Sequence, residues 1–203
     1  MCIRDSFQTP YQFGSYLLYF GRLSYVKGVK TLLKAAKKNQ HIPIKIAGTG
    51  PILKELKCYT EAHKIKNVSF VGFQKGNDLF ELIAGARATI VPSEWFENFP
   101  LSVIESLAMG RPVIGANIGG IPEQVINRQT GFIFESGNTK QLLTAISKLW
   151  ELPKEKHELL SQSCRAFALS AYNREDHYNK LVNLFYTVVS EAHKEKAILK
   201  PVV

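Results

Sequence analysis

The feature that most constrains the fold of this chain is an alternation of short apolar runs with amphipathic stretches of helical period. The apolar runs are rich in β-branched and aromatic residues, which is typical of buried strands. Alternation of this kind predicts an α/β fold, a doubly wound, Rossmann-like parallel sheet covered by helices on both faces. We predict strands at 16–20, 42–47, 68–71, 88–91, 112–115 and 131–134, and helices at 52–64, 79–86, 100–110, near Pro122 and at 141–150, with a further basic helix entered from the loop after the first strand.

The length of the chain favours one domain followed by additional helices. A sequence of 203 residues, 45% of them hydrophobic, is long enough for one sizeable core and too short for two. Residues 1–14 show no periodicity and are predicted to be a tail or remnant, residues 15–172 the domain, and residues 173–203 a C-terminal helix. Beyond Pro153 we predict helices at 154–171 and 174–197, and one face of the second is apolar (Tyr178, Leu181, Leu184, Phe185, Val188).

The positive charge of the chain is concentrated in its first third. The formal net charge is +9, and residues 1–70 hold 12 Lys or Arg against Asp5, Glu55 and Glu61. Five lysines there follow helical spacing (Lys27, Lys30, Lys34, Lys37, Lys38). Two interpretations stay open, a solvated helix face and a peripheral contact with an anionic membrane. Nucleic acid is disfavoured as a partner, because the stripe is short and lacks interleaved aromatic residues.

Several classes of protein and site are disfavoured by the sequence. No run approaches the roughly 18 apolar residues of a membrane span, and no signal peptide is evident, so we predict a cytoplasmic protein, free or at the inner membrane face. The three cysteines form no C-x-x-C pair, the histidines lack ligand spacing, and no D-x-D occurs, so neither a metal nor another cofactor is expected. The I-A-G-T-G-P segment fails the dinucleotide fingerprint, because Leu53 stands where the third glycine belongs.

Candidate functional residues follow the carboxyl ends of successive predicted strands. Ligands of open α/β sheets bind along that edge, so we expect these loops to converge on one crevice. Arg22 and Lys27 lie on the first loop, and two cations there can bind a diphosphate. The loops in question are Gly21-Arg22, Gly48–Pro51, Gly72-Phe73, Ser93–Glu97 and Gly119–Glu123.

The stretch from Pro92 to Gly110 places two carboxylates, Glu97 and Glu105, eight residues apart across a strand–loop–helix junction. Free backbone N–H groups at the start of that helix, near Asn98 to Leu101, would face the same crevice and attract anions. A site that offers N–H groups to phosphate and carboxylates to hydroxyls suits a sugar nucleotide.

These motifs resemble those of glycosyltransferase family 4, retaining enzymes of the GT-B fold. E-N-F-P-L-S-V-I-E is similar to the family's E-x7-E motif, and G-R-L-S-Y-V-K-G to its G-R-L-x3-K-G segment. I-A-G-T-G-P, V-S-F-V-G-F, G-G-I-P-E and T-G-F-I-F resemble further family segments in the same order. The resemblance covers residues 16 to about 197 and implies the C-terminal, donor-binding half of such an enzyme. The acceptor, a sugar or a lipid-linked molecule, would reach the cleft through an N-terminal domain that this sequence does not show.

The resemblance also implies roles for individual residues. Glu97 would lie beside the transferred sugar, Glu105 would hold the ribose, and Arg22 and Lys27 would bind the donor pyrophosphate. We therefore predict Glu97, Arg22 and Lys27 as catalytic. The predicted donor-binding residues are Glu105, Gly50, Gly72, Phe73, Ser93, Asn98, Phe99, Pro100 and Leu101.

The function implied is transfer of a hexose from a nucleoside diphosphate sugar, such as a UDP- or GDP-sugar, to an alcohol acceptor with retention. Two alternatives stay open at this point. One is a nucleotide-sugar-binding module without transfer activity, and the other is a GT-B sugar-nucleotide epimerase. The spacing of Glu97 and Glu105 favours transfer.

Overall fold

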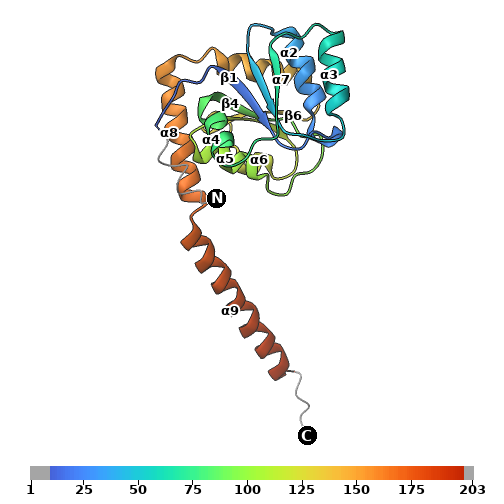
Figure 1. The fold of residues 1–203 in the computed structure, drawn as a ribbon. Coiled ribbons are helices and arrows are strands. Elements are labelled where there is room, and N and C mark those ends of the chain that lie inside the picture. The colour runs from blue at the N-terminus through green and yellow to red at the C-terminus, as the bar shows by residue number, and fades with distance from the viewer. Residues whose placement is uncertain (1–9, 199–203) are drawn as a thin grey trace. The chain divides into compact units, whose positions relative to one another are not determined.

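The computed structural model describes residues 10–198, and its centre is a six-stranded sheet in the order β3-β2-β1-β4-β5-β6 (Figure 1). All paired strands are parallel, so the predicted doubly wound, Rossmann-like class is confirmed. The strands are β1 (Tyr16–Phe20), β2 (Ile44–Ala47), β3 (Val68–Gly72), β4 (Ala86–Val91), β5 (Val113–Asn117) and β6 (Gly131–Glu135).

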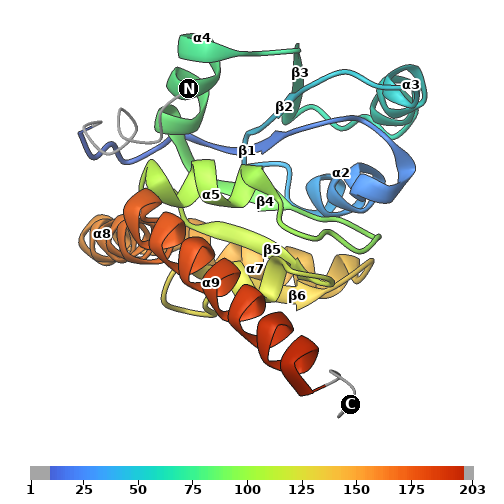
Figure 2. The same cartoon turned by 90° about the horizontal axis from the view of Figure 1, so that it is seen from below.

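Helices cover both faces of the sheet (Figures 1 and 2). One face carries α2 (Val29–Lys38), α3 (Leu53–Ala62) and α7 (Thr139–Trp150). The opposite face carries α4 (Gly76–Gly85), α5 (Leu101–Ala108) and the short α6 (Ile121–Gln124). A 3₁₀ turn, η1 (Tyr25–Lys27), joins β1 to α2, and α8 (Lys154–Ala171) and α9 (Arg174–Ile198) follow the sheet.

The central strands are apolar throughout because both of their faces are covered. Leu17 and Leu18 are neighbours on β1 that point to opposite faces, and both are fully buried. On α2 the alternation follows the helical period instead, with Leu32 and Leu33 buried and Lys34 exposed. The hydrophobic periodicity therefore accounts for both layers of the core.

The order of the strands determines where a ligand can bind. β1 lies between β2 and β4, so the chain first builds the sheet outward through β3 and then returns to build on the other side of β1. In an open α/β sheet this reversal leaves a crevice beyond the carboxyl ends of the two central strands. Those ends are the loops after Phe20 and after Val91.

The elements differ from the prediction in two places that matter. Lys27 shares the spacing of the lysines of the basic helix, but it lies in η1 ahead of that helix, because Gly28 adopts a left-handed conformation with φ of 65° and α2 begins only after it. A side chain at Gly28 would also overlap the Pro92 carbonyl, so the two loops approach closely there. The predicted helix 79–86 starts at Gly76, and Ala86 already belongs to β4.

The described part of the predicted tail contacts the domain. Arg111, which is fully buried, donates from Nη1 to the Gln12 carbonyl at 2.6 Å, and Arg87 donates from Nε to the Gly14 carbonyl at 3.0 Å. His157 of α8 donates from Nε2 to the Arg87 carbonyl at 2.7 Å, so its Nδ1 accepts from the Tyr11 hydroxyl at 3.0 Å. Residues 11–14 are therefore bound to the sheet and to α8.

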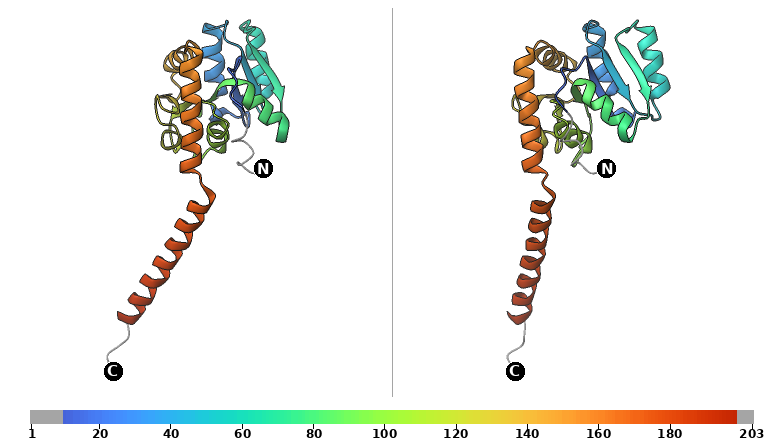
Figure 3. Two further views of the ribbon diagram at one scale, coloured as in Figure 1. Left: turned by 90° about the vertical axis from the view of Figure 1, so that its left-hand side faces the viewer. Right: turned by 60° about the vertical axis from the view of Figure 1, so that its left-hand side comes forward.

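The chain divides into two compact units at Phe167 and Ala168. The second unit contains α9, a single continuous helix (Figure 3). The side chains of its predicted apolar face are exposed (Tyr178, Leu181, Leu184, Phe185, Val188). Within residues 10–198, no helix combines the length and the hydropathy needed to cross a bilayer.

Candidate active site

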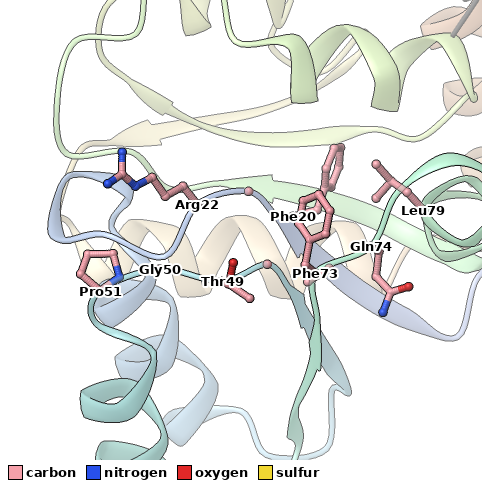
Figure 4. A pocket seen from close by; sticks show the side chains of 11 residues that line it. Phe20, Arg22, Thr49, Gly50, Pro51, Phe73, Gln74 and Leu79 are labelled. Carbon is pink, nitrogen blue, oxygen red and sulfur yellow. The ribbon is translucent and has the colours of Figure 1, made fainter.

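Two adjoining cavities lie at the carboxyl edge of the sheet. The first, of about 440 Å³, is formed by the loops after β1, β2 and β3 (Figure 4). The second, of about 420 Å³, is formed by the loops after β1 and β4 and the start of α5. Phe20, Gly21 and Arg22 line both cavities, so the loop after β1 is their common wall. The second cavity coincides with the crevice at the reversal of strand order.

Among the described residues that line these cavities, Arg22 is the cation without a partner. Its backbone is held because Tyr19, buried beneath it, donates from its hydroxyl to the Arg22 carbonyl at 2.8 Å. Burial raises the pKa of Tyr19, so this hydroxyl stays protonated and keeps donating. Within residues 10–198, the exposed guanidinium of Arg22 has no hydrogen-bond or ion-pair partner. It therefore stays available to an anion in either cavity.

Glu97 is neutralised by Lys27, a pairing that the sequence did not predict. Lys27 Nζ lies 2.5 Å from Glu97 Oε1, and both side chains are largely shielded from solvent. Ser93, itself buried, donates from its hydroxyl to the same carboxylate oxygen at 2.8 Å. These two donors fix the orientation of the Glu97 carboxylate toward the second cavity, which all three residues line.

The loop that holds Glu97 is fixed by two neighbouring loops of its own sheet edge. The Gly120 N–H donates to the Glu97 carbonyl at 2.7 Å, and a side chain at Gly120 would overlap the Asn98 carbonyl. The paired glycines after β5 lack side chains, and this allows their backbone to approach the backbone of the Glu97 loop closely. Ser136, after β6, donates from its hydroxyl to the Ser93 carbonyl at 2.9 Å.

The same loop is also bound to η1 and to α2. The Glu94 N–H donates to the Val26 carbonyl at 2.8 Å, and the buried Thr31 donates from its hydroxyl to Glu94 Oε1 at 2.6 Å. Segments that follow the strands on both sides of β4 therefore hold one loop in place.

Glu105 lies in the second turn of α5 and lines the second cavity. Its side chain is half-buried, and burial raises the pKa of its carboxyl because the charged form loses hydration. No described residue donates a hydrogen bond or an ion pair to it. A carboxylate that is desolvated and unpaired in a cavity is ready to accept hydrogen bonds from ligand hydroxyls.

The first cavity has an aromatic and polar lining. Phe73 is 68% exposed, and Figure 4 shows Phe73 and Phe20 among the side chains that form the cavity. Gln74 donates from Nε2 to the Val71 carbonyl at 2.7 Å, which leaves its Oε1 as an acceptor. A flat ring with polar neighbours suits a planar heterocycle.

Most of the predicted site residues line one of the two cavities. Gly50 and Phe73 line the first, Arg22 lines both, and the second contains Lys27, Ser93, Glu97, Phe99, Pro100, Leu101 and Glu105. Two lie outside both linings. Asn98 is exposed with its carbonyl against Gly120, and Gly72 accepts from the Gly48 N–H at 2.7 Å, with φ of 75° and open space where a side chain would be.

Several cavity residues were not predicted. Thr49 was expected only as a member of the Gly48–Pro51 loop, and Gln74 lies two residues after β3, so its position after a strand was the available signal. Tyr19 gave no such signal, since a tyrosine in an apolar run looks like an ordinary core residue. Among residues 10–198, no group of three or more His, Cys, Asp or Glu side chains could hold a metal ion.

Comparisons with known proteins agree with this geometry. The O-antigen chain mannosyltransferase C of Escherichia coli is 26% identical over 178 residues, 86% of this chain and 47% of that protein. A D-rhamnosyltransferase of Pseudomonas aeruginosa is 30% identical over 146 residues, 71% of this chain and 38% of that protein. This chain therefore spans less than half the length of these relatives.

The solved structure of HepE from Anabaena in complex with UDP has a TM-score of 0.79 at 22% identity, over 86% of this chain and 49% of that one. This likeness shows the fold and agrees with the GT-B architecture expected from the sequence. A family model described as glycosyl transferases group 1 matches residues 8–167. The match spans most of the sequence, and the chain therefore belongs to the glycosyl transferases group 1 family.

Proposed function

We propose that this chain is the C-terminal, donor-binding half of a retaining glycosyltransferase of family 4. The whole enzyme transfers a hexose from a nucleoside diphosphate sugar to an alcohol acceptor, a sugar or a lipid-linked molecule. The acceptor approaches through an N-terminal domain, toward which we assign the apolar face of α9. The reaction uses no metal and no other cofactor, and we place the enzyme in the cytoplasm or at the inner membrane face.

The observation that carries this proposal is the pair of adjoining cavities with Arg22 on their common wall. The first offers a flat aromatic surface at Phe73 for a base, and the second offers carboxylates for hydroxyl groups. A free cation between the two suits a diphosphate that links them. The complexes of HepE with UDP and with UDP-glucose support a nucleotide sugar as the ligand class.

In this scheme the residues of the chain stabilise the leaving group. Arg22 and the backbone N–H groups at the start of α5 compensate the charge that develops on the diphosphate. Lys27 joins them once the donor competes for its ammonium group. Glu97, oriented by Ser93, accepts hydrogen bonds from the sugar hydroxyls, and Glu105 accepts those of the ribose.

Calorimetric titration of the chain with UDP, GDP and ADP tests the proposal. We expect one of the three diphosphates to bind and Arg22→Ala to abolish that binding. Lys148→Ala removes an exposed cation of α7 that lines neither cavity, and it should leave the affinity unchanged. Absence of binding for all three diphosphates, or equal losses in both variants, would contradict a built diphosphate site.

A further inference from the structure

The outer sides of α2 and α3 form a strongly basic surface that the nucleotide site does not use. The two helices lie side by side on one face of the sheet (Figures 1 and 2). The lysines of these helices and of the loop after α3 are all exposed. We call this surface the lysine face: Lys30, Lys34, Lys37, Lys38, Lys54, Lys57, Lys64 and Lys66.

The charge of the lysine face is compensated only in part. Its acidic residues are Glu55 and Glu61, and Glu55 accepts from Lys30 Nζ at 2.9 Å and from the Tyr25 hydroxyl at 2.6 Å. The fold does not require the remaining lysines, because α2 packs on the sheet through Leu32 and Leu33. The excess charge therefore calls for an explanation outside the core.

A group of exposed apolar side chains borders the lysine face at the start of α2. Tyr25, Val26, Trp95 and Phe96 are 66%, 43%, 64% and 72% exposed, and we call them the aromatic rim. The two loops that carry them lie against each other, because the Glu94 N–H, directly before Trp95, donates to the Val26 carbonyl at 2.8 Å. Large apolar side chains exposed together on a protein surface mark an interaction site.

We infer that the lysine face and the aromatic rim together bind the surface of a bilayer that contains anionic lipid. Anionic headgroups would compensate the lysines, and the interfacial region would accommodate Trp95 and Tyr25, whose rings favour that depth. Lys30, Lys34, Lys37 and Lys38 are spaced by three or four residues or lie next to such a position, so they share one side of α2. From Lys30 to Lys38 the helix rises about 12 Å, and a flat surface can therefore contact all four. A duplex nucleic acid would meet the lysines but leave the aromatic rim in water.

This orientation brings the edge of the catalytic crevice to the membrane. The aromatic rim belongs to the loops that carry Lys27 and Glu97, so the second cavity would open close to the headgroups. A lipid-linked acceptor would then be held beside the site. The binding itself does not depend on the proposed transfer reaction, so vesicle binding and nucleotide binding can fail separately.

Sedimentation with vesicles tests the inference on the complete chain. We expect binding to vesicles of phosphatidylcholine with phosphatidylglycerol, little binding to pure phosphatidylcholine, and a loss of binding as salt is added. Lys34→Glu with Lys37→Glu should weaken binding at least about tenfold, since each basic residue near an anionic surface contributes roughly fivefold. The control is Lys154→Glu with Lys156→Glu, which changes the net charge equally on exposed residues of α8 and should bind as the wild type does.

Fluorescence of Trp95 tests the aromatic rim. A blue shift on adding the anionic vesicles is expected, and Trp95→Phe, which leaves Trp150 in place, should remove it. No binding to the anionic vesicles, equal binding to the neutral ones, tighter binding to a duplex DNA at the same salt, or equal losses in both lysine variants would each overturn the inference. Binding without a Trp95 shift would overturn the part assigned to the aromatic rim.

Discussion

Replacing Glu105 by glutamine should change stability and nucleotide affinity in opposite directions. In the ligand-free fold the carboxyl is half-buried without a partner, and burial raises its pKa. The charged form is thus disfavoured in the folded state, and stability rises as pH falls through the raised pKa, because the folded state takes up the proton before the unfolded one. Glu105→Gln removes this charge, so at pH 7 it should increase the free energy of unfolding and flatten its dependence on pH.

Nucleotide binding should respond the other way. In the proposed complex the carboxylate accepts hydrogen bonds from two ribose hydroxyls, and a hydrogen bond to a charged group contributes about 1.5 to 3 kcal/mol. Losing one such bond would weaken binding by roughly 10- to 150-fold, since 1.4 kcal/mol is a factor of ten. Glutamine retains one acceptor, so Glu105→Ala should weaken binding further than Glu105→Gln does.

Urea unfolding at several pH values and calorimetric titration with the diphosphate that binds would measure both effects. Glu135→Gln is the matched control, because this exposed carboxylate at the end of β6 lines neither cavity. An unchanged affinity in Glu105→Gln would remove Glu105 from the ribose site. A lower stability at pH 7 would mean that the carboxylate has a partner, and would refute the reasoning from burial.

Three other changes probe the scaffold. Gly120→Ala places a methyl group on the Asn98 carbonyl and should cost about 1 to 3 kcal/mol in urea unfolding, with weaker nucleotide binding because the Glu97 loop shifts. Burial lowers the pKa of His157 from the ordinary 6.5, so stability should fall as pH drops below that value. His157→Gln should flatten this dependence, whereas His41→Gln, at an exposed histidine, should not. Leu33→Ala should lower the free energy of unfolding by about 2 to 5 kcal/mol, because it leaves a cavity at a fully buried position. Lys34→Ala, at the exposed neighbouring position, should lower it by less than about 0.5 kcal/mol.

Hydrophobic periodicity predicted the layers of this fold because burial on both faces determines the residue types of every central strand. The strand order could not be predicted in the same way. Alternation requires parallel strands, but it does not say that β4 pairs with β1 rather than with β3. The start of β4 was missed for a local reason, since Ala86 follows α4 with no turn residue between and alanine fits either element.

The candidate site could be predicted as a set of loops, because every one of them follows the carboxyl end of a strand. The contacts between these loops could not be predicted from the sequence. Lys27 and Glu97 are 70 positions apart, and each was assigned to a different part of the ligand. Thr31 and Glu94 are 63 positions apart, and neither residue type suggests the other. Such pairs depend on the strand order, which brings β1 beside β4.

The pairing of Lys27 with Glu97 changes how the charges of the crevice should be understood. Two cations and two carboxylates line the second cavity, and Lys27 and Glu97 are already paired with each other. The groups that remain unpaired before a ligand arrives are therefore Arg22 and Glu105. A diphosphate sugar that enters meets the free guanidinium first, and it must compete with Glu97 for Lys27. Since Ser93 donates to the same oxygen of Glu97, the carboxylate keeps one donor when Lys27 moves to a phosphate. The ion pair therefore holds both groups in position without leaving either one uncompensated while the site is empty.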